Sequence, residues 1–256
     1  MKTIKPRSKL LVNTKKNKYK IFVGTAMTGL LRSEWVLARY CQIIPCNWAN
    51  VDCYQWLDTF APLGYSVANA QNLICKGFVE SKSEWLFLLE HDVVIPPDCF
   101  MQLNDYIRKE TVPVVSGLYF TRSRPAEPMI YRGRGNSYVT DWKKGDKVWA
   151  DGVPTGCLLI HGSIINKMWE ESKEYMAGNV QTREVFKTPQ DIWFDPDKNM
   201  WHKQSGTSDL HWCTRVMKEK FFEKAGWKKY QKKKYPFLVD TKLFCKHIGM
   251  DGKQYP

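Results

Sequence analysis

The sequence predicts an α/β fold, in one large domain or two small ones, with a buried strand of a parallel sheet at its centre. The run Trp85–Leu89 is apolar throughout, as expected of a strand that is covered on both faces in a parallel sheet. A second buried run, at 112–120, follows a helical pattern at 98–109. The 256 residues, 43% of them hydrophobic and 25% charged, are enough to form such a core and are typical of a soluble globular protein.

The first part of the chain alternates strands and helices. Apolar side chains recur at helical spacing from Val67 to Phe78, which predicts a helix leading into the central strand. Gly24 and Gly29 would let the backbone approach a ligand, but they do not form the G-x-G-x-x-G fingerprint of a Rossmann dinucleotide site. In order, we expect a strand at 19–24, a loop at 25–29, a helix at 33–41 capped by Ser33 and a helix at 66–80, with 42–63 left unassigned.

The second part is less regular. Pro96 and Pro97 stop the central strand from continuing as a paired ladder. Residues 177–206 mix glycine, proline, aspartate and aromatic residues, which predicts a long loop that serves as a lid or binding loop. We further expect an arginine-rich loop at 122–134, a strand at 157–160, a helix at 163–176, a helix from about 205 to 226, and a late strand over 238–240 and 243–249.

The central strand ends in three polar residues, Glu90-His91-Asp92. Because side chains alternate along an extended chain, we expect Glu90 and Asp92 to point one way and His91 the other. Two carboxylates suit a hard divalent cation, and open α/β sheets bind ligands at the carboxyl ends of their strands. The alternative interpretation is a strand that simply ends in solvent with ordinary acidic residues.

The net charge of +13 is concentrated in two stretches. Residues 1–20 carry eight Lys or Arg and no acid, and residues 218–234 carry eight Lys against two Glu. Such stretches favour a polyanionic partner, either nucleic acid or the surface of an anionic membrane. For the N-terminal arm, a solvated end that aids solubility is at least as good an explanation. We expect a flexible basic arm at 1–18 and a folded domain at 19–256.

Other features indicate the compartment. No apolar run is long enough to span a bilayer, and the basic N-terminus lacks the apolar core of a secretion signal. The eight cysteines show no C-x-x-C spacing, so reduced thiols are expected rather than a zinc site or disulfides. A cytoplasmic location follows as an expectation.

Several further side chains are candidates for binding or catalysis. Amides at 69–72 could reach a base or a pyrophosphate, and the arginines of 122–134 could hold a diphosphate or an anionic acceptor. The glycine-containing segment from Asp151 to Gly156 is typical of a binding rim. Asp209 is either a general base at a helix start or an acid favoured there by the helix dipole. His247 alone is more often structural than a ligand.

In their order along the chain, five segments resemble the glycosyltransferases of the GT-A fold, especially the family 2-like group. The segment 68–72 resembles the family's Arg-Asn helix start, with Gln71 where arginine is usual. The strand 86–92 is similar to the one carrying the D-x-D motif, with Glu90 in place of the first Asp. The segment 151–160 is similar to the family's glycine-rich acceptor segment. The segment 207–213 is similar to the family's S-E-D-x-x-F-C stretch, with Ser208 at the position of the usual glutamate. The segment 245–249 is similar to the one that carries the C-terminal metal-binding histidine.

The resemblance implies a single GT-A-type α/β domain with a mixed, mainly parallel central sheet flanked by helices. Its nucleotide-sugar-binding half would lie at 19–120, and its acceptor-binding half, including the basic C-terminal region, at 121–256. It implies a metal-dependent hexosyltransferase that moves a sugar from a nucleotide-diphospho-sugar to an acceptor hydroxyl with inversion, using Mn²⁺ or Mg²⁺. The site residues it implies are Asp209 as catalytic base; Asp92, His247 and Glu90 as metal ligands; Thr25, Gln71, Asn72, His91 and Asp92 for the nucleotide-sugar; and Asp151, Gly152, Arg122, Arg124 and Trp193 for the acceptor.

The acceptor and the reaction class are left open. The lysine-rich stretches suggest a polyanion such as a hydroxymethylated base in DNA, which the aromatic residues of 177–206 could hold after it is extruded from the helix. A glycan or lipid-linked acceptor at a membrane surface, reached by peripheral contact, explains the same lysines. A non-catalytic module of this fold that binds nucleic acid or membrane also fits the sequence, as does a nucleotidyltransferase. The sugar, the nucleotide base and the oligomeric state are not specified by the sequence.

Overall fold

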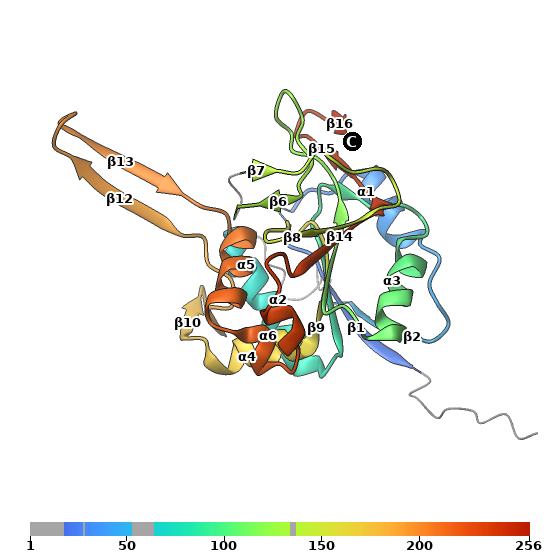
Figure 1. The fold of residues 1–256 in the computed structure, drawn as a ribbon. Coiled ribbons are helices and arrows are strands. Elements are labelled where there is room, and N and C mark those ends of the chain that lie inside the picture. The colour runs from blue at the N-terminus through green and yellow to red at the C-terminus, as the bar shows by residue number, and fades with distance from the viewer. Residues whose placement is uncertain (1–17, 28, 53–63, 134–136) are drawn as a thin grey trace, which may run out of the picture.

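The computed structural model describes residues 18–27, 29–52, 64–133 and 137–256, so the expected basic arm lies almost wholly outside the described residues. A seven-stranded sheet runs through the centre of the molecule (Figure 1), in the order β2-β1-β3-β9-β5-β14-β8. Its strands are β1 (Tyr19–Gly24), β2 (Trp48–Asp52), β3 (Trp85–Leu89), β5 (Val114–Leu118), β8 (Lys147–Ala150), β9 (Cys157–His161) and β14 (Phe237–Phe244).

The sheet is mixed. Strand β1 pairs in parallel with β2 and β3, and β14 pairs in parallel with β5. Strand β9 lies between β3 and β5 and runs antiparallel to both, and β8 is antiparallel to β14 at the edge. The mixed α/β architecture is confirmed, but the expectation of a mainly parallel sheet is wrong, because parallel and antiparallel pairs are equally numerous among the described strands of this sheet. Because β9 is inserted between strands of the first half, the two parts of the chain share one sheet.

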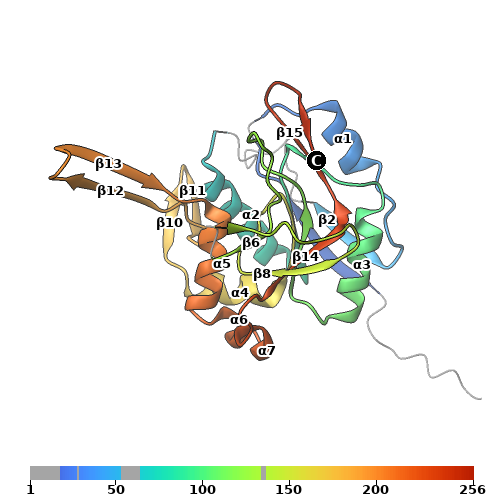
Figure 2. The same ribbon diagram turned by 45° about the horizontal axis from the view of Figure 1, so that its top comes forward.

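Helices cover both faces of the sheet (Figures 1 and 2). Side chains of β3 alternate between the faces: Leu86 and Leu88 join one buried cluster, whereas Trp85 and Phe87 join the other. The first cluster includes residues of α2 (Val67–Ser81), α4 (Gly162–Glu171), α5 (Ser208–Lys218) and α6 (Phe221–Lys224). The second includes residues of α1 (Ser33–Tyr40) and α3 (Cys99–Lys109). Full burial of each large side chain contributes about 1.5–3 kcal/mol, so the apolar run of β3 fixes the centre of the fold.

The prediction of a long loop at 177–206 is wrong. Two antiparallel hairpins occupy this region: β10 (Glu174–Ala177) with β11 (Val180–Arg183), and β12 (Gln190–Asp195) with β13 (Met200–Ser205). The first turns at Gly178, which has a positive φ of 57°. The second projects from the body of the molecule (Figure 1). Aromatic side chains on both of its faces remove the alternation that would mark strands in a sequence.

Three expected helix boundaries are also wrong. The helix expected to extend to 176 ends at Glu171, where the Ser172 hydroxyl donates to the Met168 carbonyl and the chain turns into β10. The helix expected to reach 226 is divided at Lys220, whose φ of 59° begins α6. Ser33 does not cap α1, because the structure places Arg32 at the cap position without a side-chain hydrogen bond. A short helix, α7 (Lys228–Gln231), follows α6.

The carboxyl ends of β1, β3, β5 and β14 meet at one edge of the sheet, together with the start of the reversed strand β9. A small three-stranded sheet closes this edge: β15 (Lys246–Ile248) pairs with β4 (Val93–Val94) and with β16 (Gln254–Tyr255). The pair β6 (Tyr131–Arg132) and β7 (Ser137–Tyr138) lies after β5 in the chain. This arrangement brings His247 beside the residues that follow β3.

Candidate functional site

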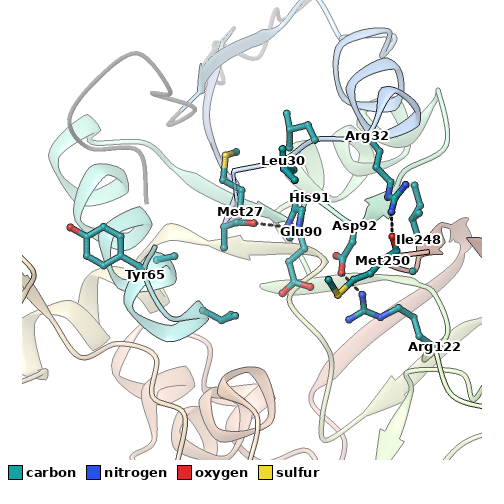
Figure 3. A pocket seen from close by; sticks show the side chains of 15 residues that line it. Met27, Leu30, Arg32, Tyr65, Glu90, His91, Asp92, Arg122, Ile248 and Met250 are labelled. Atoms are coloured by element: carbon teal, nitrogen blue, oxygen red, sulfur yellow. Dashed lines mark hydrogen bonds and ion pairs between the residues drawn. The ribbon is translucent and has the colours of Figure 1, made fainter. Parts of the chain in front are cut away.

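A pocket of about 680 Å³ opens at this edge of the sheet (Figure 3). The loop after β1 forms one wall, the start of α2 a second, and the segment after β15 a third. The polar and charged side chains that line it are Arg32, Tyr65, Glu90, His91, Asp92 and Arg122. The volume is in the range of natural small-molecule sites, and cationic and anionic side chains converge in it.

Glu90 is the first residue after β3. Its backbone N–H donates to the Gly156 carbonyl at 3.1 Å, which continues the pairing with β9 by one residue. Its side chain accepts a hydrogen bond from Thr155 (2.8 Å), whose hydroxyl accepts one from the Gln71 amide (3.0 Å). Burial, assisted by the nearby Asp92 charge, raises the pKa of Glu90 to about 7. Glu90 is thus held in place by Thr155, and near neutral pH its carboxyl is divided between the neutral and ionised forms.

Asp92 lies between the side chains of His247 and Arg122. Its Oδ2 is 3.3 Å from His247 Nε2 and 3.2 Å from the Arg122 guanidinium. Burial raises the pKa of Asp92, but the hydrogen bond from His247 and the charges of His247, His91 and Arg122 outweigh burial and leave that pKa below its usual value. Asp92 is therefore ionised at neutral pH.

The expectation that Glu90 and Asp92 point the same way is confirmed, but the extended backbone from which it was derived is wrong. The strand ends at Leu89, and the Val93 N–H donates to the Glu90 carbonyl at 3.2 Å, so the chain turns at this point instead of remaining extended. As a result, Glu90, His91 and Asp92 all line the pocket, and the carboxylates of Glu90 and Asp92 point into the same space (Figure 3). The His91 Nδ1–H donates to the Ala26 carbonyl at 3.3 Å.

The donor set suits a hard divalent cation in part. Asp92 Oδ1 is buried and has no hydrogen-bond partner among the described residues. His247 Nδ1 must carry a proton because it donates to the Phe120 carbonyl (2.8 Å), so Nε2 is left facing Asp92 as either a protonated nitrogen or a ligand. No three His, Cys, Asp or Glu side chains of the described ranges are grouped as a ready metal cage. Mg²⁺ is usually held by one or two carboxylates together with substrate phosphates. The carboxylates of Glu90 and Asp92 fit that pattern.

The other residues expected to bind the nucleotide lie in two different environments. Thr25 is buried at the end of β1, and its hydroxyl and the Gln71 carbonyl oxygen lack hydrogen-bond partners among the described residues. Each residue is the sequence neighbour of a pocket-lining residue, Ala26 or Ala70, but neither Thr25 nor Gln71 lines the pocket itself. Asn72, in contrast, bonds to both backbone groups of Phe186 and to the Tyr175 hydroxyl. Its amide ties α2 to the segment before β12 and does not line the pocket.

Asp209 lies in the first turn of α5 and is half-buried. Its Oδ1 accepts a hydrogen bond from the Leu210 N–H at 2.8 Å. Burial raises its pKa, while hydrogen bonds from Thr207 and from the backbone oppose that rise. Asp209 is close enough to Glu90 for its charge to contribute to the raised pKa of Glu90. Asp209 does not line the pocket itself, but a carboxylate with a raised pKa whose charge reaches Glu90 is suited to accept a proton.

Comparison with known proteins gives a fold-level likeness. No protein-family model matches the sequence, and no curated protein sequence matches it. Among solved structures, the chain is similar to A197 from STIV, with a TM-score of 0.50 and 14% sequence identity over 93% of this chain and 93% of that chain. At this identity the likeness concerns the fold alone.

The residues expected to bind the acceptor are dispersed. Arg122 lines the pocket, whereas Arg124 is exposed in the loop after it. Asp151 accepts a hydrogen bond from the Gly133 N–H (2.9 Å). It lines a separate cavity of about 50 Å³, which Lys234 also lines. Gly152 forms an isolated antiparallel β-bridge with Tyr131. Trp193 is on the projecting β12–β13 hairpin.

Three pocket features were not predicted from the sequence. Arg32 donates to the Met250 carbonyl and brings a second guanidinium to the pocket. Thr155 positions Glu90, and Tyr65 stands at the opposite wall (Figure 3). A signal was present only for Thr155, which lies in the glycine-containing segment 151–156. Among the described helices, none has the length and apolarity to cross a bilayer.

Proposed function

We propose that this chain is a metal-dependent glycosyltransferase of the GT-A type that transfers a sugar from a nucleotide-diphospho-sugar to an acceptor hydroxyl with inversion. One observation carries the proposal: Asp92 and His247, 155 residues apart in the sequence, come within 3.3 Å of each other at a pocket that two arginines line. An anionic ligand together with a cation suits this mixture of charges. The mixed α/β sheet, with the pocket at the carboxyl ends of its parallel strands, supports a ligand-binding role for this edge.

In the proposed site, Asp92 and His247, with Glu90, would hold Mn²⁺ or Mg²⁺, which offsets the charge of the donor diphosphate and stabilises the leaving group. Arg32 and Arg122 add positive charge on the same side of the pocket. Thr25, Gln71 and His91 would contact the nucleotide. The buried, unpartnered oxygens of Thr25 and Gln71 support this assignment, because such atoms cost free energy unless a ligand satisfies them.

Asp209 would accept the proton of the acceptor hydroxyl as that oxygen attacks the anomeric carbon. The bond from the anomeric carbon to the diphosphate oxygen breaks as the new glycosidic bond forms. Attack from the face opposite the leaving group inverts the configuration, and no enzyme nucleophile is needed. The raised pKa of Asp209 favours proton transfer at neutral pH.

The acceptor is proposed as a hydroxyl-bearing group on a polyanion, such as a hydroxymethylated base in DNA. The lysines of 218–234 support a polyanion, and most of them are exposed on and around α6 and α7. These helices lie at the end of the sheet away from β15 and the pocket (Figures 1 and 2), so only a long polyanion would reach both regions. A glycan or lipid-linked acceptor is the second candidate, because Leu30 and Met250 expose apolar surface at the pocket.

Calorimetric titration with a panel of nucleoside diphosphates, in Mn²⁺ and then in EDTA, tests the proposal. We expect metal-dependent binding of one nucleotide, with at least tenfold weaker binding in Asp92→Ala. Absence of binding to every nucleotide under both conditions would refute it. Product analysis separates the reaction classes: release of a nucleoside diphosphate supports a glycosyltransferase, release of pyrophosphate a nucleotidyltransferase, and tight nucleotide binding without turnover on any acceptor a binding module.

A further inference from the structure

Strand β8 forms an edge of the seven-stranded sheet, and helix α7 lies beside it. The rings of Trp149 in β8 and Tyr230 in α7 have their centres 6.0 Å apart. Lys233, two residues after α7, places its Nζ 3.5 Å from the centre of the Trp149 ring and 4.8 Å from that of Tyr230. The Arg132 side chain, from β6, donates to the Trp149 carbonyl at 3.0 Å. Cationic side chains from separate parts of the chain therefore meet around one tryptophan.

Aromatic rings also lie under the neighbouring cations. The guanidinium carbon of Arg132 is 4.6 Å from the centre of the Tyr235 ring, and Lys234 Nζ is 5.2 Å from the same centre. Lys229 Nζ is 5.1 Å from the centre of the Tyr230 ring. The attraction between cation and ring restricts these long side chains, so less side-chain entropy is lost when they bind a ligand. The four cations that we call the basic edge are Arg132, Lys229, Lys233 and Lys234.

The lysines of the basic edge have no acidic partners in the described part of the chain. Residues 218–234 hold eight lysines, and within the described ranges only Lys224 of these forms an ion pair, with Glu171 at 2.5 Å. Like charges are also close together here, because burial lowers the pKa of Lys233 and the charge of Lys229 lowers it further. An anionic partner at this surface would relieve the repulsion between the lysines.

The surroundings of the basic edge favour nucleic acid over an anionic membrane. Helices that lie on a membrane combine basic side chains with an exposed apolar face that enters the bilayer. In the described structure, no large apolar side chain between residues 202 and 249 is exposed. Lys233 lies over the rings of Trp149 and Tyr230, where a base would otherwise stack. Phosphates, which give a duplex about one charge per 1.7 Å, are therefore the groups that these cations suit.

We propose that the basic edge binds the phosphate backbone of nucleic acid without reading its base sequence. Lysine and arginine neutralise phosphates and release the counterions condensed around them, which drives binding and makes it depend on salt. None of the four residues lines the pocket, so this contact requires neither a metal nor a nucleotide-sugar. Binding at the basic edge therefore does not depend on the transfer reaction proposed above.

Fluorescence anisotropy of labelled duplex DNA, single-stranded DNA and RNA, each of mixed sequence and titrated with the full chain in EDTA, tests the proposal. We expect the chain to bind all three with a Kd of about 1–100 µM at physiological salt, the usual range of non-specific binding. The triple variant Lys229→Gln, Lys233→Gln, Lys234→Gln should bind about tenfold more weakly or worse. For the duplex, the slope of log Kd against log salt should fall by about 2–3, because each lost phosphate contact removes about 0.9.

A matched control removes the same charge elsewhere. The triple variant Lys20→Gln, Lys173→Gln, Lys203→Gln changes exposed lysines in β1, beside β10 and in β13, and should retain the wild-type affinity. Replacing the three lysines of the basic edge by arginine should also retain binding, because the positive charges remain. Circular dichroism and urea unfolding of every variant show whether the fold is retained.

Three outcomes would overturn the proposal: no binding to any nucleic acid at low salt, unchanged binding in the glutamine variant of the basic edge, or an equal loss in the matched control. The last would mean that net charge alone is responsible. Binding to vesicles of phosphatidylserine and phosphatidylcholine, without binding to nucleic acid, would overturn it in favour of a membrane. Because every titration is done in EDTA without a nucleotide-sugar, failure of the proposed transferase site would leave these results unchanged.

Discussion

The Asp92 side chain has two differently placed oxygens. Oδ2 is occupied by His247 and Arg122, and Oδ1 is buried without a partner among the described residues. A buried carboxylate oxygen without a partner is unfavourable by itself. The simplest physical explanation is that a ligand binds Oδ1 of Asp92, and the location of Asp92 at the pocket agrees with that explanation.

At Asp209, replacement with asparagine separates catalysis from binding. Asp209→Asn keeps the size of the side chain but removes its capacity to accept a proton. Turnover should fall by about 10²–10⁴-fold, the usual contribution of a general base, while calorimetric nucleotide binding stays unchanged. Asp141→Asn, at an exposed position, serves as the control and should retain full turnover. Full turnover in Asp209→Asn would remove this residue from the mechanism.

Thr155 connects Glu90 to Gln71, so its hydroxyl should be important for stability. Thr155→Val would leave both partners without their hydrogen bonds in the protein interior, at a cost of about 1–3 kcal/mol in the free energy of unfolding. Thr155→Ser keeps the hydroxyl and should cost less. Urea unfolding of both variants measures the difference; a loss in Thr155→Ser as large as that in Thr155→Val would show that the hydroxyl is not the main contribution.

Sequence reasoning found some site residues better than others. Glu90 and Asp92 were predicted on physical grounds, because polar residues directly follow a buried apolar run. The proximity of His247 to them was implied only by the family resemblance, since nothing in a lone histidine encodes a neighbour 155 residues away. Arg32 was missed because its place depends on the Met250 carbonyl, which only the folded chain brings near.

Among the elements, helix α4 begins with an unusual cap. The cap residue is His161, whose Nδ1 accepts a hydrogen bond from the Ser163 N–H, while Trp85 and Trp227 pack against its ring. Burial lowers the pKa of His161 to about 4, although the Glu84 charge acts in the opposite direction. Protonation would remove the acceptor and place a positive charge at a helix N-terminus.

The stabilisation linked to His161 therefore depends on pH. Since the pKa is lower in the folded chain than the usual 6.5, this contribution is complete above pH 6.5 and is lost as the pH falls toward 4. The two pKa values correspond to about 3 kcal/mol. In His161→Asn, which can cap but does not titrate, urea unfolding should show a correspondingly smaller loss of stability between pH 6.5 and 4. Identical pH profiles for the two proteins would show that His161 is not responsible.

The elements themselves were predictable to different degrees. The strand 85–89 was predicted correctly, because a short, uninterrupted apolar run in a soluble domain is best buried as a strand covered on both faces. The reversed direction of β9 was not predicted, since an apolar run carries no information on strand direction. The β12–β13 hairpin was missed because aromatic residues on both faces leave no period of two, although the turn residues at 196–199 between two aromatic segments were a usable signal.

For the whole molecule, binding at the pocket should stabilise the entire fold. The pocket walls come from segments near residues 26–32, 65–70, 90–92, 122 and 248–250, which meet only in the complete domain. A nucleotide with Mn²⁺ at one hundred times its Kd should therefore add about 2.7 kcal/mol to the free energy of unfolding. Calorimetric melting should show the increase in wild type and little of it in Asp92→Ala. The same increase in EDTA would contradict a metal-dependent site.

The late position of β15 in the chain has a consequence for how the site matures. Residues 246–250 supply His247 and one wall of the pocket, and β15 is joined to the rest through its pairing with β4. On the ribosome, the strands β1, β2, β3, β9 and β5 emerge well before this segment. A nascent chain can therefore assemble most of its sheet while it still lacks the ligand-binding edge. The capacity to bind a nucleotide would then arise only after residues 246–250 have left the ribosome and β15 has paired with β4.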